Sequence, residues 1–248
     1  MKDRPKKSLA QNFLIDAHYQ RKIVAAVALA RPSSILEIGP GRGAITQILC
    51  ALNIPITAIE KDEGLALSLQ EKFPRVRVLA ADVFTVPIAK FVTRPVTVVG
   101  NLPYNVSTKI FFHLLKSAEL FDHFFFMMQR EVGQRCVALP GTRAYGFLSV
   151  LAQFFTDITC LFDVPPTVFK PRPKVFSRFM KFSLKGKSFN ENLPFILFVK
   201  SLFNLRRKTI ASALKKMYKN HKIFGEMKGA RAEDLSVEEL LALYRAIV

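Results

Sequence analysis

The stretch Ile35-Leu36-Glu37-Ile38-Gly39-Pro40-Gly41-Arg42-Gly43 decides the fold of this 248-residue chain. Its first four residues predict a short buried strand, and its glycines predict a turn in which the backbone approaches a ligand closely. Apolar residues at helical intervals follow from about residue 44, so we expect a helix whose N-terminal N–H groups face the turn. A glycine loop alone is weak evidence for nucleotide binding, because many turns look like it.

Polar residues end the next predicted strands. Glu60 follows the apolar run 56–59 and lies 21 residues after Gly39, a spacing that suits an acid receiving the ribose hydroxyls in a nucleotide-binding βαβ unit. A third strand leads to Asp82, and a β-branched run ends at Asn101. The carboxyl ends of parallel strands lie along one edge of an open sheet. We therefore expect these four residues to meet in one crevice.

The last of these strands runs into Asn101-Leu102-Pro103-Tyr104. Pro103 lacks an N–H and biases Leu102 toward an extended conformation. The segment therefore presents a carboxamide, a backbone carbonyl without a helical partner, and an aromatic ring. Two acceptors and a ring suit a flat group that carries an –NH2, such as adenine or an amide.

Alternation of strand and helix patterns up to about residue 155 predicts an α/β fold, with a doubly wound parallel sheet. The strands are too few for a barrel. The predicted helices are 17–30, 62–72, 108–117 and 131–138, and further strands are predicted at 124–128, 155–163 and 175–184. Only helical patterns follow, at 193–218 and 236–247. We therefore predict a cofactor-binding catalytic domain at 1–184 and a small α-helical domain at 189–248, joined by a linker.

Composition indicates a polyanionic partner. Lys and Arg number 37 against 19 acids, a formal charge of +18. The cations cluster at Lys2, Arg4, Lys6 and Lys7 and again between residues 200 and 222. Three cysteines without paired spacing indicate neither a disulfide framework nor a metal site. No apolar run has the length of a membrane span and no signal-peptide pattern opens the chain, so we expect a reducing, cytoplasmic location.

In their joint order, these motifs resemble the small-subunit ribosomal RNA adenine N6,N6-dimethyltransferases, which are Rossmann-like enzymes that use S-adenosylmethionine. The resemblance covers nearly the whole chain. Its stretches lie at residues 7–16, 37–43, 60–62, 81–82, 100–108, 129–132, 144–146, 165–174, 203–209 and 231–236. Two small departures from the family pattern, Ala10 for Gly and Ile45 for Leu, leave the chemistry untouched.

The resemblance implies roles for individual residues in binding S-adenosylmethionine. Asn12 and Leu14 would approach its methionine part, and Gly39 with its loop would pass along the methionine and ribose. Glu60 would hold the ribose hydroxyls. Asp82 would accept from the adenine amino group, and Asn101 would stand beside the sulfonium.

The tetrapeptide is then the predicted catalytic segment. The N6 lone pair of adenine is delocalised into the ring and is a poor nucleophile. We hypothesise that Asn101 Oδ1 and the Leu102 carbonyl accept the two N6 hydrogens, so that the lone pair points toward the methyl group. Pro103 stiffens this arrangement and Tyr104 stacks on the purine. Phe169 either closes the opposite face of the base or packs in the core.

The resemblance implies a substrate of two adjacent adenines in a hairpin loop near the 3′ end of small-subunit rRNA, within a pre-ribosomal particle. Arg206 and Arg207 are plausible phosphate contacts, although a solvated charged face is the alternative. We expect a monomer. Rival functions are methylation of a large-subunit rRNA adenine, and a non-catalytic RNA-binding role in ribosome assembly. DNA adenine and protein glutamine methylation are disfavoured, the first by the lack of a DNA-reading domain and the second by the charge.

Overall fold

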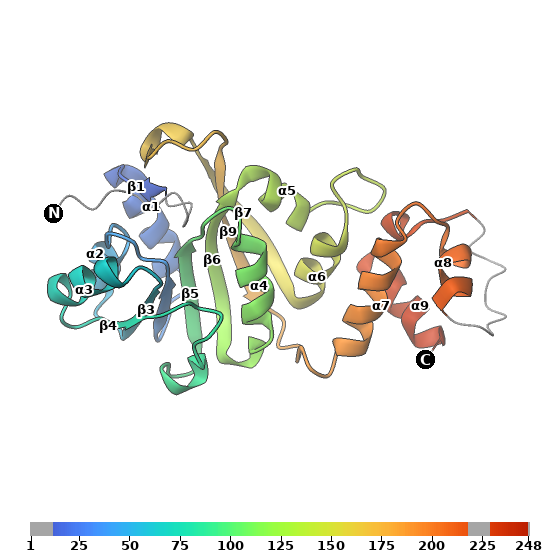
Figure 1. Cartoon of the computed structure of the whole chain (residues 1–248), viewed down its shortest axis with the longest axis horizontal. Helices are drawn as coiled ribbons and strands as arrows, with labels where there is room; N and C mark the ends of the chain where they lie inside the picture. The colour runs from blue at the N-terminus through green and yellow to red at the C-terminus, as the bar shows by residue number, and fades with distance from the viewer. Residues whose placement is uncertain (1–11, 218–228, 248) are drawn as a thin grey trace. The chain divides into compact units, whose positions relative to one another are not determined.

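A seven-stranded sheet organises the computed structural model, which describes residues 12–217 and 229–247 (Figure 1). Its strand order is β4-β3-β2-β5-β6-β9-β7. Neighbouring strands are parallel from β4 through β6, whereas β9 runs antiparallel to β6. The strands span Ile35–Ile38 (β2), Ile56–Glu60 (β3), Arg77–Ala80 (β4), Val96–Asn101 (β5), Phe121–Gln129 (β6), Thr156–Val164 (β7) and Ser177–Leu184 (β9). The doubly wound α/β fold is thereby confirmed.

The predicted strands form where short apolar runs are buried on both faces. Every residue of β2 and β3 is buried, as are the first five residues of β5. The helices span Ala17–Ala28 (α1), Thr46–Leu49 (α2), Glu63–Lys72 (α3), Ser107–Leu115 (α4), Arg130–Cys136 (α5), Phe147–Phe155 (α6), Leu193–Asn204 (α7), Ile210–Met217 (α8) and Val237–Ile247 (α9). Carboxylates begin two of them: Asp16 accepts a hydrogen bond from a backbone N–H at the start of α1, and Asp62 does so at α3.

Three elements differ from the sequence prediction. Residues 193–218 were expected to form one helix, but α7 and α8 are separated by a turn in which Lys208 N donates to Leu205 O. Helix α6 was not predicted, because its sequence is apolar almost throughout. A two-stranded sheet was also missed: Phe13–Leu14 (β1) pairs antiparallel with Phe169–Lys170 (β8). Two-residue strands carry no recognisable pattern.

The chain divides into two compact units. The first comprises the chain up to Gly133 together with Thr159–Leu184, and the second comprises Gln134–Ile158 and the chain from Lys185 onward. The second unit includes α6, which the predicted boundaries assigned to the first domain. Helix α6 packs against α7 and α9, with the rings of Phe154 and Phe195 4.8 Å apart. Within the described residues, no helix has the length and apolarity that crossing a membrane requires.

Candidate active site

A cleft of about 630 Å³ lies at the carboxyl edge of the parallel strands. Gly39, Glu60, Asp82 and Asn101 all line it, each from the end of a different strand. The prediction that these four residues meet in one crevice is confirmed. The lining also includes Asn12 and Leu14 from the N-terminal segment, and Leu102, Pro103 and Tyr104 from the segment after β5.

Glu60 ties the glycine loop to the start of α3. One carboxylate oxygen accepts the Gly41 N–H at 2.9 Å, and the other accepts the Asp62 N–H at 2.9 Å. Burial raises the pKa of Glu60, while these two hydrogen bonds oppose the rise. Gly41 has φ +60°, and a Cβ there would lie 2.9 Å from the Phe13 ring, so the turn requires glycine. Gly39 is also left-handed, at φ +65°.

Glu37 is a functional candidate that the sequence analysis did not single out. Its side chain is buried beneath the cleft and accepts a 2.7 Å hydrogen bond from Thr46 Oγ1, at the first turn of α2. Burial, with a further contribution from the nearby Glu60 carboxylate, raises its pKa to about 7. The signal was present in the sequence as a carboxylate within an otherwise apolar strand. Glu37 therefore holds the helix that follows the glycine loop.

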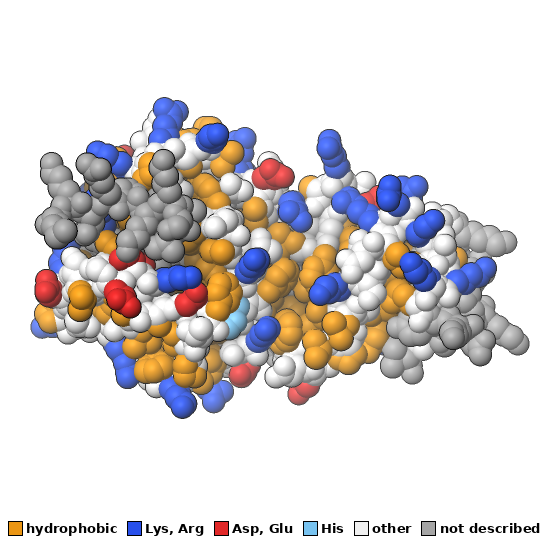
Figure 2. Space-filling model, in the orientation of Figure 1, with side chains coloured by type: hydrophobic (Ala, Val, Ile, Leu, Met, Phe, Trp, Pro, Cys, Tyr) orange, Lys and Arg blue, Asp and Glu red, His pale blue; other side chains and the backbone are white. Residues whose placement is uncertain are grey.

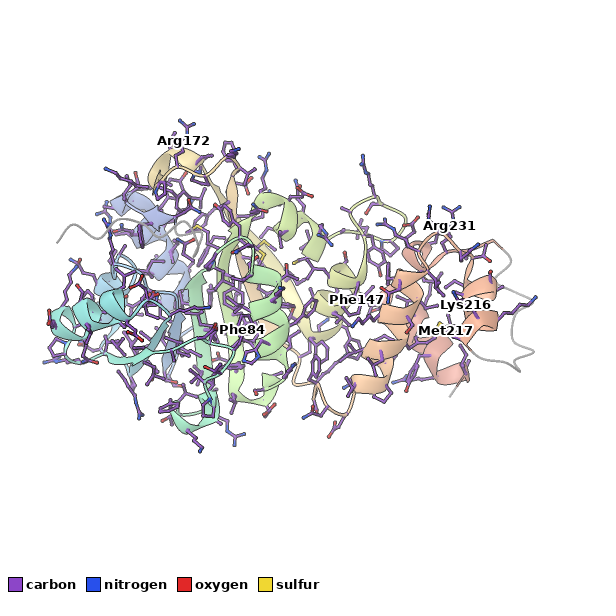
Figure 3. The ribbon with its side chains drawn as sticks, viewed as in Figure 1. Phe84, Phe147, Arg172, Lys216, Met217 and Arg231 are labelled. Atoms are coloured by element: carbon purple, nitrogen blue, oxygen red, sulfur yellow. The ribbon has the colours of Figure 1, made fainter. Side chains whose placement is uncertain are left out.

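Asp82 lies at the opposite end of the cleft from Asn101 in strand order. Its carboxylate accepts the Phe84 N–H at 3.1 Å and the Lys61 ammonium at 2.8 Å. These contacts, that from Lys61 foremost, lower the pKa of Asp82, so the group is a charged acceptor at neutral pH. Phe84, labelled in Figure 3, also lines the cleft and is 39% exposed. Its ring lies edge-on to the His113 ring of α4. Sequence reasoning missed Phe84, because a single aromatic residue after a strand has no distinguishing pattern.

Asn101 is oriented by the N-terminal segment. Its Nδ2 donates a 2.9 Å hydrogen bond to the backbone carbonyl of Asn12. Since the amide nitrogen is engaged, the Oδ1 atom is the part of the side chain left to accept from a ligand. Leu102 follows with a buried side chain and donates its N–H to Met127 O at 3.1 Å. No backbone N–H of the described residues donates to the Leu102 carbonyl, which is therefore a second acceptor at the same place.

Tyr104 is anchored through its hydroxyl. The phenol and the Ser177 hydroxyl lie 2.6 Å apart, and Ser177 is fully buried at the first position of β9. Pro103 O accepts the N–H groups of Val106 and Ser107, and Ser107 begins α4. Burial raises the pKa of Tyr104, so the phenol stays protonated. Ser177 gave no sequence signal, because it is contributed by a strand more than seventy residues away.

Phe169 packs in the core, one of the two alternatives that the sequence left open. Its side chain is 3% exposed, belongs to the hydrophobic core and does not line the cleft. In β8 it pairs with Leu14, whereas its neighbour Lys170 lines the cleft. Successive side chains of a strand point to opposite faces, so only one of the two can face the ligand. The core alternative that the sequence left open is the one that the structure adopts.

Arg206 and Arg207 differ in their surroundings. Arg206 pairs with Glu233 and donates to the Arg143 carbonyl at 3.2 Å, so it stabilises the second unit internally. Arg207 is exposed. Lys and Arg side chains are frequent over this unit on the face shown in Figure 2. The clustered cations predicted at residues 2, 4, 6 and 7 and at Lys219 lie outside the described residues.

The cleft's donor and acceptor set fits a nucleoside cofactor. A left-handed glycine turn, a buried carboxylate and a second, charged carboxylate follow the adjacent parallel strands β2, β3 and β4, in the order in which such cofactors extend. The positive φ angles of Gly39 and Gly41 are typical of a glycine loop that a ligand approaches closely.

Comparison with known proteins agrees with this geometry. The model of the family described as "Ribosomal RNA adenine dimethylase" matches residues 2–247. Ribosomal RNA small subunit methyltransferase A from Chlorobium phaeobacteroides (strain BS1) is 39% identical over 244 residues, which cover 98% of this chain and 93% of the relative. The corresponding protein of Chlorobaculum parvum is 38% identical, with 98% and 89% covered.

Solved structures share the fold. A dimethyladenosine transferase from Plasmodium falciparum superposes with a TM-score of 0.79 at 22% identity, covering 93% of this chain and 95% of that one. The 23S rRNA methyltransferase ErmE superposes with a TM-score of 0.71 at 24% identity, covering 94% and 98%.

Proposed function

Since this chain belongs to the ribosomal RNA adenine dimethylase family, we propose that it dimethylates adenine N6 in small-subunit ribosomal RNA, with S-adenosylmethionine as methyl donor. The observation that carries the mechanism is the Asn101–Asn12 hydrogen bond, which leaves a carboxamide oxygen as an acceptor beside the Leu102 carbonyl. The formal charge of +18 fits a polyanionic substrate.

Different residues of the cleft hold different parts of the methyl donor. We assign the methionine part to Asn12, Leu14 and the Gly39 loop, the ribose hydroxyls to Glu60, and the adenine amino group to Asp82. S-adenosylmethionine supplies an electrophilic methyl group, so the protein needs to orient the nucleophile and exclude water.

Asn101 and Leu102 orient the N6 amine of the target adenine. Their two oxygens accept the two N6 hydrogens, which draws the amine toward a pyramidal geometry and points its lone pair at the donor. Tyr104 stacks on the base, and its bond to Ser177 fixes the ring position. The proton leaves N6 for solvent after transfer, so this scheme assigns no His or carboxylate as general base.

The finer features of the substrate follow from the family. We propose two adjacent adenines in a hairpin loop near the 3′ end of the RNA, presented on a pre-ribosomal particle in the cytoplasm to a monomeric enzyme. Loop bases enter a pocket without the cost of opening a duplex. The helical domain predicted at 189–248, with Arg207, would contact phosphates.

Labelled-methyl transfer tests the proposal directly. Small-subunit particles that lack the modification are incubated with the enzyme and labelled S-adenosylmethionine, and the RNA is then digested to nucleosides. We expect labelled N6,N6-dimethyladenosine in the small-subunit arm and none in parallel arms with large-subunit RNA or DNA. Label in the large-subunit arm alone would reassign the substrate. Particle binding without label would indicate an assembly factor.

A further inference from the structure

An arginine and an exposed phenylalanine form a cation–π pair at the same edge of the sheet as the catalytic segment. The Arg130 guanidinium lies over the Phe176 ring, 5.0 Å from its centroid, and Arg130 N donates to Phe176 O at 2.9 Å. Phe176 is 42% exposed, whereas most phenylalanines of this sheet are buried. An exposed ring covered on one face by a guanidinium is a flat, cationic platform.

Hydrogen bonding joins this platform to the target pocket. Phe176 directly precedes Ser177, which holds the Tyr104 hydroxyl. Arg130 follows Gln129, the residue of β6 that pairs with Ser177 of β9. Arg130 and Phe176 therefore each lie one residue beyond the paired ends of β6 and β9, next to the serine that holds the Tyr104 hydroxyl.

The loop that precedes Phe176 is positively charged. Lys170, Arg172 and Lys174 are all exposed, and no acid occurs between residues 164 and 178. Figure 3 shows Arg172 at the outer end of this loop, directed away from the ribbon. Asp163 is bound mainly by Arg178, through two hydrogen bonds of 2.6 and 3.0 Å, and it also forms a longer ion pair of 3.9 Å with Arg130.

We propose that Arg130 and Phe176 stack on an unpaired RNA base that neighbours the target adenine, while Lys170, Arg172 and Lys174 contact the adjoining phosphates. Unpaired RNA bases are bound in this manner, on aromatic rings and guanidinium planes. The proposal rests on the proposed function, because it takes the base beside Tyr104 to be the methyl acceptor.

Steady-state kinetics with the small-subunit particle test the platform. Phe176→Ala should raise the KM for RNA about tenfold, because it removes the stacking of a base on an aromatic side chain. Phe176→Leu should behave like Phe176→Ala, and Phe176→Tyr should stay within about twofold of the parent. Arg77→Ala is the matched control, because Arg77 covers the Phe91 ring at 4.9 Å in a similar pair at the far edge of the sheet. Cofactor affinity and melting temperature should not change in any of these variants.

Two results would overturn the proposal. If the KM of Phe176→Leu equals that of Phe176→Tyr, the ring is not a stacking surface. If the KM of Phe176→Ala equals that of Arg77→Ala, the platform does not contact RNA.

Direct RNA affinity, measured by filter binding without methyl donor, separates failure of this proposal from failure of the proposed function. An enzyme that binds the particle through Phe176 and transfers no methyl group would refute the methyltransferase assignment alone. Photocross-linking from 5-iodouridine placed beside the target adenine should label the Phe176 peptide.

Discussion

Asn101 Nδ2 lies 2.9 Å from the carbonyl oxygen of Asn12, so the N-terminal segment determines which way the catalytic carboxamide faces. Two sequence-distant residues thus cooperate in one function. The position of the acceptor oxygen depends on a backbone group that no side-chain substitution at residue 12 removes.

Asn101→Ala should reduce kcat by about 10²–10³, because the variant lacks an acceptor that acts on the reacting amine. Asn101→Asp should be similarly impaired, since a carboxylate cannot donate to Asn12 O. S-adenosylmethionine affinity, measured by calorimetry, should change much less than kcat. Asn190→Ala, at an exposed site, is the control. Undiminished turnover in Asn101→Ala would remove this residue from the mechanism.

Tyr104→Phe and Ser177→Ala should each have a modest effect, a few-fold in the KM for RNA, because each removes one hydrogen bond but keeps the ring. The double variant should be no worse than either single one, since both break the same contact. Tyr104→Ala should be far more damaging because the stacking surface itself is lost. Additive effects of Tyr104→Phe and Ser177→Ala would show that the two hydroxyls act separately.

Glu37 should make stability depend on pH. The folded carboxyl keeps its proton up to a pKa of about 7, whereas the unfolded one releases it near 4.5. Between these values the native state binds more protons, so the free energy of unfolding falls as pH rises, by roughly 3 kcal/mol in total. Glu37→Gln keeps the acceptor for Thr46 and should lose this dependence. Urea unfolding at pH 5 and pH 8 measures this dependence. If the free energy of unfolding changes equally between the two pH values in the parent and in Glu37→Gln, the burial argument is wrong.

Gly41→Ala should destabilise the fold and weaken cofactor binding together. Its positive φ and the 2.9 Å approach of a Cβ to Phe13 both oppose any side chain. Gly64→Ala is a control of opposite sign: the site is helical, its nearest contact is 3.4 Å, and alanine should add about 0.5–1 kcal/mol of stability. Thermal melts and S-adenosylmethionine titrations distinguish the two. A stable, binding-competent Gly41→Ala would show that the loop adapts.

Arg206→Ala and Arg207→Ala should separate stability from RNA affinity. Removing Arg206 breaks the pair with Glu233 and the bond to Arg143 O, so it should lower the melting temperature slightly. Removing the exposed Arg207 should leave the melting temperature unchanged and flatten the salt dependence of RNA binding. Binding measured at several salt concentrations tests this. Equal melting temperatures for both variants would mean that the Arg206 pair contributes nothing.

The sequence predicted those parts of the site that lie at strand ends. Gly39, Glu60, Asp82 and Asn101 each follow an apolar run, and parallel pairing alone brings them together. Residues placed by long-range packing were not predictable. Ser177 contacts Tyr104 from a strand that is distant in sequence. Lys170, and not Phe169, faces the cleft because of a two-residue strand pairing that has no sequence pattern. Arg206 was read as a nucleic-acid contact because its partner, Glu233, is 27 residues away.

The strand that carries Asn101 is the middle member of the seven, with three strands on either side. Partial opening of a sheet starts at its margins, and here β4, whose side chains are largely accessible, forms one margin. The backbone amides leading to Asn101 are therefore among the last to exchange with solvent. Heat that frays this edge leaves the Asn101 segment in place but displaces Asp82, which follows β4, so cofactor binding is lost before the centre of the sheet opens.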